Sequence, residues 1–228
     1  MVTILQIETA TTSCSAALSV NGKTIALKEV TAQNIHASSL TLFIQEVMAT
    51  AGLSYHDLDA IAVSKGPGSY TGLRIGVSTA KGLCFALDKP LIGISTLKMM
   101  AMGFLNSQDG YKGFIAPMID ARRMEVFTAL YLPDMTEILP ITAKIIDNTS
   151  FQDELAIREI TFIGDGAAKC RDAIVSPNAK FSDLNVNSAA NMSNLAYEAF
   201  RSNHIEDLAY FEPYYLKDFV ITAPKKKV

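Results

Sequence analysis

Two acidic residues that follow apolar runs are the first groups in this chain that could do chemistry. Glu8 comes after residues 2–7 and Asp120 comes after residues 114–119, and both runs have the character of a buried strand. Two carboxylates facing one cleft can hold a magnesium ion or position a water molecule. Each acid could equally do no more than end its strand, and Asp120 could be tied to Arg122 or Arg123 in its own turn.

Glycine-rich turns follow two other apolar runs. Gly66 and Gly68 flank a proline after residues 60–63, and Gly164-Asp165-Gly166 comes after residues 161–163. Such a turn points free backbone N–H groups at whatever lies above the strand, so a phosphate or a carboxylate is a natural ligand. The signal is weak, because the turn lacks the Lys-Ser/Thr of a P-loop and the G-x-G-x-x-G of a dinucleotide site. An ordinary strand-to-helix turn explains the same residues.

Metal ligands and nucleophiles are harder to find. His36, His56 and His204 have no paired ligand spacing, and the chain has neither an H-E-x-x-H motif nor a nucleophile elbow, which argues against a metallopeptidase. The three cysteines are odd in number and far apart, as expected of reduced thiols in a cytoplasmic protein. We therefore expect no metal site and no cofactor.

Two segments are predicted to form helices, one with a row of apolar residues and the other with a row of small residues. The first carries apolar residues at helical spacing and ends at Gly52; these are Leu40, Phe43, Ile44 and Val47. The second runs from about residue 72 to 87, with Ser69 or Thr71 as its N-cap. Small residues recur in it every four positions, at Gly72, Gly76 and Ala80, which predicts a groove that a second helix could enter closely. That second helix could belong to this chain or to another one.

The order of the elements predicts an α/β fold with two mixed sheets. Residues 2–7, 14–20 and 24–30 read as antiparallel strands, with a hairpin at Asn21-Gly22, and a strand-helix alternation follows. The same outline returns after residues 106–112, so we predict domains at residues 1–105 and 106–228. Two such lobes would place Glu8, Asp120 and the two glycine turns around one cleft.

Composition limits the compartment and the partners. The chain has 228 residues and a formal net charge of −3, which argues against independent binding to nucleic acid. Its only basic run is Lys225-Lys226-Lys227, which we interpret as a solvated tail. No apolar run is long enough to span a membrane, and the first residues lack the pattern of a signal peptide. We expect a cytoplasmic protein.

Seven motifs spread over nearly the whole chain resemble the bacterial TsaB (YeaZ) family. The motifs are Ile4-Leu-Gln-Ile-Glu-Thr-Ala-Thr, Gly66-Pro-Gly-Ser-Tyr-Thr-Gly-Leu-Arg-Ile-Gly, Ala80-Lys-Gly-Leu, Pro90-Leu-Ile-Gly-Ile-Ser, Asp120-Ala-Arg, Gly164-Asp-Gly and Pro213-Tyr-Tyr-Leu-Lys. The resemblance implies a two-lobed actin, hexokinase and Hsp70-like (ribonuclease H-like) fold. It also implies an accessory, non-enzymatic role in forming threonylcarbamoyladenosine beside the tRNA anticodon.

The partners that the resemblance implies are a metal-bearing TsaD-type catalytic subunit, a TsaE-type ATPase and, in their absence, a second copy of the chain. Contact with tRNA would occur only through the complex. On this hypothesis the helix faces at Leu40, Phe43, Ile44, Val47, Gly72, Gly76 and Ala80 form the partner interface. Glu8, Gly66, Gly68, Asp120, Gly164 and Asp165 then line a vestigial nucleotide cleft.

Two departures bear on catalysis. Where the catalytic relative carries two metal-binding histidines four residues apart, this chain has Thr96 and Met100, which are poor ligands for most such metals. The first turn carries Glu8 where the fold often has Asp, so the usual phosphate and magnesium geometry is in doubt. The alternative hypothesis is a phosphotransferase or ATP hydrolase of the same fold, with Glu8 and Asp120 as its acids.

Overall fold

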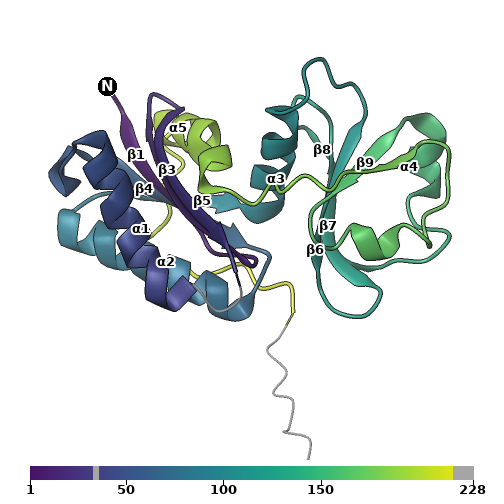
Figure 1. The fold of residues 1–228 in the computed structure, drawn as a ribbon, viewed down its shortest axis with the longest axis horizontal. Helices are drawn as coiled ribbons and strands as arrows, with labels where there is room; N and C mark the ends of the chain where they lie inside the picture. Colours follow the sequence, from purple (N-terminus) through teal and green to yellow (C-terminus); the bar gives the residue numbers. More distant parts are fainter. Residues whose placement is uncertain (33–35, 218–228) are drawn as a thin grey trace, which may run out of the picture.

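The computed structural model describes residues 1–32 and 36–217 of the chain, so the three lysines at 225–227 lie outside the described residues. Two lobes stand side by side, each built on a five-stranded sheet (Figure 1). The first sheet has the order β3-β2-β1-β4-β5. Its strands are β1 (Thr3–Glu8), β2 (Ser13–Val20), β3 (Lys23–Thr31), β4 (Ala60–Gly66) and β5 (Leu91–Ser95).

The second sheet repeats this topology. Its order is β10-β9-β6-β7-β8, which from the other edge is again third, second, first, fourth and fifth strand. The strands are β6 (Phe114–Asp120), β7 (Glu125–Tyr131), β8 (Glu137–Ile145), β9 (Ile160–Ile163) and β10 (Ala179–Phe181). In both sheets the first three strands are antiparallel and the last two run parallel to the first. The expected two-lobed α/β fold with mixed sheets is confirmed.

Helices α1 (His36–Ala51) and α2 (Tyr70–Leu87) cover the outer face of the first sheet (Figure 1). A cluster that includes Leu5, Ile7, Ile61 and Val63 from the strands meets the apolar rows of both helices. The short 3-10 turn η1 (Tyr55–Asp57) leads from α1 into β4. On the second lobe, α4 (Gln152–Ile157) and the 3-10 turn η2 (Ala168–Cys170) pack on the outer face through a separate cluster.

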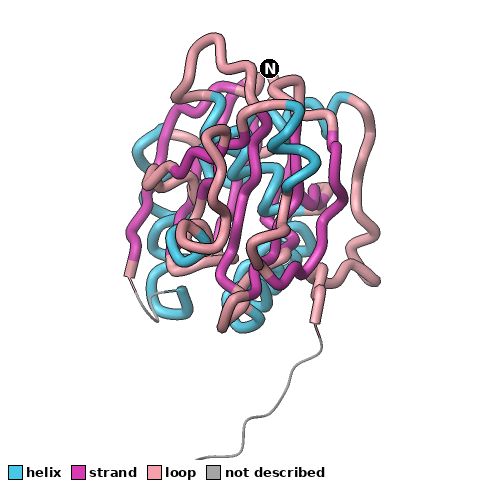
Figure 2. Tube along the Cα trace, turned by 90° about the vertical axis from the view of Figure 1, so that its right-hand side faces the viewer, coloured by secondary structure: helices cyan, strands magenta, loops and turns pink. Residues whose placement is uncertain are grey.

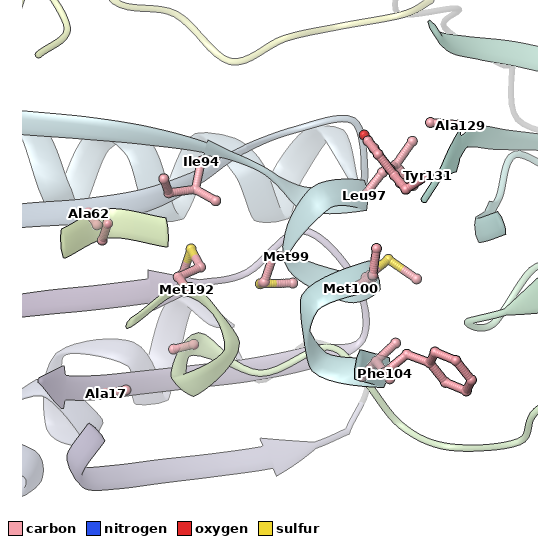
Figure 3. Close-up of a cluster of buried hydrophobic side chains, with 14 of the residues drawn as sticks. Ala17, Ala62, Ile94, Leu97, Met99, Met100, Phe104, Ala129, Tyr131 and Met192 are labelled. Atoms are coloured by element: carbon pink, nitrogen blue, oxygen red, sulfur yellow. The ribbon is translucent and has the colours of Figure 1, made fainter. Parts of the chain in front are cut away.

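A shared apolar layer joins the two lobes. Helix α3 (Thr96–Leu105) lies between the sheets, with Met99, Met100 and Phe104 buried. Figure 3 shows Ile94 and Met192 on one side of α3 and Ala129 and Tyr131 on the other. Because one continuous cluster contains residues of both sheets, the space between the lobes is packed core. Figure 2 shows the strands running roughly along the vertical, so their ends gather at the upper and lower sides of the molecule.

The chain returns to the first lobe after β10. The 3-10 turn η3 (Ala189–Met192) and helix α5 (Ser193–Arg201) contact strands of the first sheet, and Glu206 bridges to Leu91 in β5 (Figure 1). A boundary near residue 105 separates the strands of the two sheets, but it assigns this returning segment to the second lobe, although η3 and α5 contact the first sheet. We therefore propose that the first lobe consists of residues 1–105 and 186–217.

The local predictions leave out two elements. Helix α4 and strand β10 fall in stretches for which no element was predicted. Both missed elements are short, six and three residues, so neither develops a periodic pattern. None of the helices in the described part of the chain combines the length and apolar character that a membrane crossing needs.

Candidate functional site

Glu8, the acid at the end of β1, is wholly buried. Its Oε1 accepts a hydrogen bond from the Ala10 backbone N–H at 2.5 Å. Its Oε2 and the Ser64 hydroxyl make no hydrogen bond of ordinary geometry with the described residues. Burial raises the pKa of Glu8 to about 7, against smaller opposing effects of the Ser64 hydroxyl and the Ala10 N–H. A carboxyl group sealed from solvent in this way is poorly placed to bind magnesium in an open cleft.

The glycine turn after β4 is filled by the chain's own backbone. A Cβ atom on Gly66, which has a φ of 112°, would lie 2.6 Å from the Tyr214 carbonyl oxygen. The Tyr214 N–H donates to the Lys65 carbonyl at 2.6 Å. On the other side, a Cβ on Gly68 would collide with the Ala10 carbonyl, and the Ser69 N–H donates to that same oxygen at 2.6 Å. The Ser69 N–H, which could bind a phosphate here, is therefore already bonded to protein, and both glycines lie against backbone carbonyl groups.

The small-residue row of α2 also meets this chain. A Cβ on Gly72 would collide with the Thr9 carbonyl oxygen, and a Cβ on Gly76 with the Thr9 hydroxyl. The Thr9 hydroxyl donates to the Gly72 carbonyl at 2.8 Å, while Ala80 is buried on the sheet side. The expectation that a second helix enters this groove is therefore corrected, because the turn after β1 occupies the groove at Gly72 and Gly76. Ser69 is the N-cap, since its hydroxyl accepts from the Gly72 N–H at 3.2 Å.

The apolar row of α1 faces inward as well. Leu40, Phe43, Ile44 and Val47 are all buried in the cluster on the outer face of the first sheet. In this structure they form core and offer no free surface to a partner. The side chains that α1 and α2 turn outward include Leu42, 59% exposed, and Phe85, 83% exposed.

The acids of the second lobe lie together at the end of β6. The Asp120 N–H donates to Asp165 Oδ1 at 3.1 Å, and Asp120 Oδ1 accepts from Lys169 Nζ at 2.5 Å and from the Arg122 N–H at 2.8 Å. Partial burial works to raise the pKa of Asp120, but the bonds from Lys169 and Arg122 outweigh it and lower that pKa. Burial raises the pKa of Asp165.

The predicted cleft residues thus fall into separate groups. Asp120, Gly164 and Asp165 belong to the second lobe, whereas Glu8 is sealed inside the first. A Cβ on Gly164 would collide with the Met100 side chain, so α3 fills the space beside that turn. The six residues do not line one open cleft.

A segment at the end of the described chain spans the two lobes, and only the sequence resemblance had pointed to it. The Tyr215 ring packs on the Tyr70 ring of α2 at 4.8 Å between centroids, and Lys217 Nζ contacts Glu125 Oε2 in β7. Residues 213–217, which we call the strap, therefore run from the Gly66 turn to the second lobe; Figure 1 shows the yellow chain end along the lower side of the first sheet. Long-range contacts of this kind have no local sequence signature.

Thr96 and Met100, which stand where the catalytic relative has histidines, lie in the core, and His36 lies against the backbone of β2. Thr96 and Met100 are wholly buried on α3, and the Thr96 hydroxyl has no partner among the described residues. His36 contacts the Ser13 carbonyl at 3.1 Å. Cys14, Cys84 and Cys170 are buried free thiols.

Comparison with known proteins gives a consistent result. Residues 29–227 match the sequence model of the family described as TsaD, tRNA N6-adenosine threonylcarbamoyltransferase. The tRNA threonylcarbamoyladenosine biosynthesis protein TsaB of Haemophilus influenzae is 31% identical over 96% of this chain and 94% of its own. TsaB of Escherichia coli is 40% identical over 58% of this chain and 55% of its own.

The fold agrees with a solved structure over nearly its full length. YeaZ from Pseudomonas aeruginosa superposes with a TM-score of 0.83 at 26% identity, covering 95% of this chain and all of that one. The chain belongs to the TsaB (YeaZ) family of tRNA threonylcarbamoyladenosine biosynthesis proteins.

Proposed function

We propose that this chain is a non-catalytic cytoplasmic subunit that pairs with a TsaD-type subunit while that subunit forms N6-threonylcarbamoyladenosine next to the tRNA anticodon. One observation carries the proposal: Glu8 and the Gly66 turn, which we expected to bind a nucleotide, contact the chain's own atoms instead. Glu8 is sealed under the first turn, and the Gly66 turn lies between Ala10 and Tyr214. This filling also counts against the phosphotransferase alternative.

The positions of Thr96 and Met100 support the same proposal. Both side chains are buried in the layer between the lobes, where Met100 packs against Gly164. A hydroxyl and a thioether are weak ligands for the divalent metals that imidazole holds. The chain's share of the reaction is then to hold the catalytic subunit in its working arrangement, together with a TsaE-type ATPase.

We place the contact with the TsaD-type subunit on the outward side of α1 and α2, because their inward side is used by the sheet. The same surface would pair two copies of the chain when the catalytic subunit is absent. Gly82 lies on this side, and a Cβ added to it would meet nothing within 4 Å. A second helix can therefore approach α2 closely at Gly82, whereas Thr9 blocks such an approach at Gly76.

Replacing Gly82 by Leu is expected to weaken pairing with the TsaD-type subunit by about tenfold or more, roughly 1.4 kcal/mol, because the side chain fills the space that the partner needs. The fold should keep or gain stability, since Gly is a poor helix former. Analytical ultracentrifugation of the mixed subunits measures the pairing.

Glu198→Leu is the matched control, since it adds the same side chain at an exposed position of α5, on the opposite face of the first sheet. Pairing should be normal in this variant. If Gly82→Leu pairs as tightly as the native chain, the proposed interface is wrong.

The whole proposal is tested by reconstitution. Threonylcarbamoyl transfer to tRNA is measured with the TsaD-type subunit and the ATPase, in the presence and absence of this chain. We expect transfer to require the chain at a one-to-one ratio with the catalytic subunit. Equal rates without it would refute the proposed function.

A further inference from the structure

The turn between β6 and β7 has a backbone that its residues disfavour. Arg122 and Arg123 both have positive φ angles, 71° and 47°, in a hairpin closed by the Ala121 N–H on the Glu125 carbonyl at 3.1 Å. Two consecutive left-handed residues favour Asn-Gly, because longer side chains are strained there. The chain uses that favoured pair in its other hairpin, where Asn21 and Gly22 have φ angles of 46° and 78°. Strained non-glycine residues of this kind tend to occur at functional sites.

Around this turn the positive charges outnumber the negative ones. Asp120 is bound to Lys169, and Glu125 contacts Lys217 of the strap, so two of the three acids near the turn are each paired with a lysine. The third acid, Asp165, lies beside Asp120 and is outnumbered by the two arginines. Both arginine side chains are exposed, and neither guanidinium group has an ion pair or hydrogen bond within residues 1–32 and 36–217. In a chain with a net charge of −3, the tip of this turn is a local positive surface.

The turn also lies where the two lobes meet. Lys217 contacts it from the strap, and the strap covers the Gly66 turn of the first lobe. A ligand bound to the arginines would therefore lie on the same side of the molecule as the ends of β1 and β4. The functional residues of this fold are expected at those strand ends.

We propose that Arg122 and Arg123 bind phosphate groups of the RNA backbone. This inference rests on the proposed function, which brings tRNA to the complex. A guanidinium group matches a phosphate with two parallel hydrogen bonds, and two adjacent ones suit a polyanion with regularly spaced charges. Met124 and Ile145 beside the turn are exposed apolar residues, so docking of an acidic protein surface is the competing explanation.

The test replaces the pair with the residues that its backbone favours, Arg122→Asn together with Arg123→Gly. This variant removes both charges and relieves the turn, so thermal unfolding should show a fold at least as stable as the native one. The tRNA dissociation constant of the assembled complex is measured by filter binding over a range of salt concentrations. We expect binding about tenfold weaker near physiological salt, and a slope of log K against log salt that is smaller by about 1.5.

Lys23→Gln together with Lys180→Gln is the control, because both lysines are exposed on edge strands of the sheets and their loss changes the net charge equally. An unchanged dissociation constant and salt slope in the arginine variant would overturn the inference. Weaker assembly of the subunits with normal tRNA binding once assembled would also overturn it, in favour of protein docking. The tRNA dissociation constant is measured separately from threonylcarbamoyl transfer. Equal transfer rates with and without this chain would refute the proposed function, whatever the arginine variant does to tRNA binding.

Discussion

Replacing Glu8 by Gln is expected to raise the free energy of unfolding by roughly 3 kcal/mol above pH 7 and to change it little below pH 4.5. The carboxyl group is wholly buried, with one oxygen that lacks a hydrogen-bond partner of ordinary geometry among the described residues. Gln has nearly the same shape, keeps an oxygen for the Ala10 N–H and carries no charge.

The sign follows from the raised pKa. Burial moves the pKa of Glu8 from 4.5 to about 7 in the folded chain. Below pH 4.5 the group is protonated in both the folded and the unfolded chain, so it has no effect. As the pH rises from 4.5 to 7, the unfolded chain releases its proton first, and the folded state loses stability relative to it. Above pH 7 both states are ionised and the penalty stays constant.

Urea unfolding of the native chain and of Glu8→Gln at several pH values between 4 and 8.5 measures this difference. Glu212→Gln, at the exposed position just before the strap, is the control and should follow the native curve. Parallel curves for Glu8→Gln and the native chain would mean that Glu8 ionises in the folded state without penalty, and the sealed environment described above would then be wrong.

The second large effect is expected from a single methyl group on α2. Replacing Gly72 by Ala should destabilise the fold by about 3 kcal/mol, because the new Cβ collides with the rigid Thr9 backbone. Replacing Gly82 by Ala should instead stabilise it by about 0.5 to 1 kcal/mol, since that position is open and Ala is the better helix former. The two substitutions are chemically identical and lie in one helix, so they differ only in what the methyl group meets.

Differential scanning calorimetry checks this pair. For a chain of this size we expect the midpoint to fall by roughly 10 °C in Gly72→Ala and to rise by about 2 °C in Gly82→Ala. Similar midpoints in the two variants would show that the turn after β1 can move away from α2. The row of small residues would then be free to accept a second helix, as the sequence suggested.

Local signals in the sequence predicted most of the fold. The Asn21-Gly22 hairpin, the alternation of strands and helices and an N-cap at Ser69 or Thr71 depend on residues close together in the chain. The structure confirms them and shows Ser69 as the cap. The repeated order of elements predicted two lobes of similar plan, and both sheets have the same strand order. The missed elements, α4 and β10, are too short to develop a period.

The candidate site could not be predicted in the same way, because it depends on what lies next to each residue. The sequence indicated that Gly66, Gly72 and Gly76 allow a close approach, but not that Thr9, Ala10 and Tyr214 make that approach. It placed an acid at Glu8 and could not show that the acid is sealed.

The sequence by itself determined the family, the two-lobed α/β plan and the residue types at the expected metal and phosphate positions. Only the tertiary structure decided that the lobes are joined by packed core, that the strap covers the first glycine turn and that lysines pair with Asp120 and Glu125, whereas Arg122 and Arg123 have no ion pair among the described residues. The reason is physical: a local pattern reports backbone preference and polarity. Burial, pairing and charge balance instead arise between residues far apart in the chain, such as Lys65 and Tyr214, whose positions differ by 149.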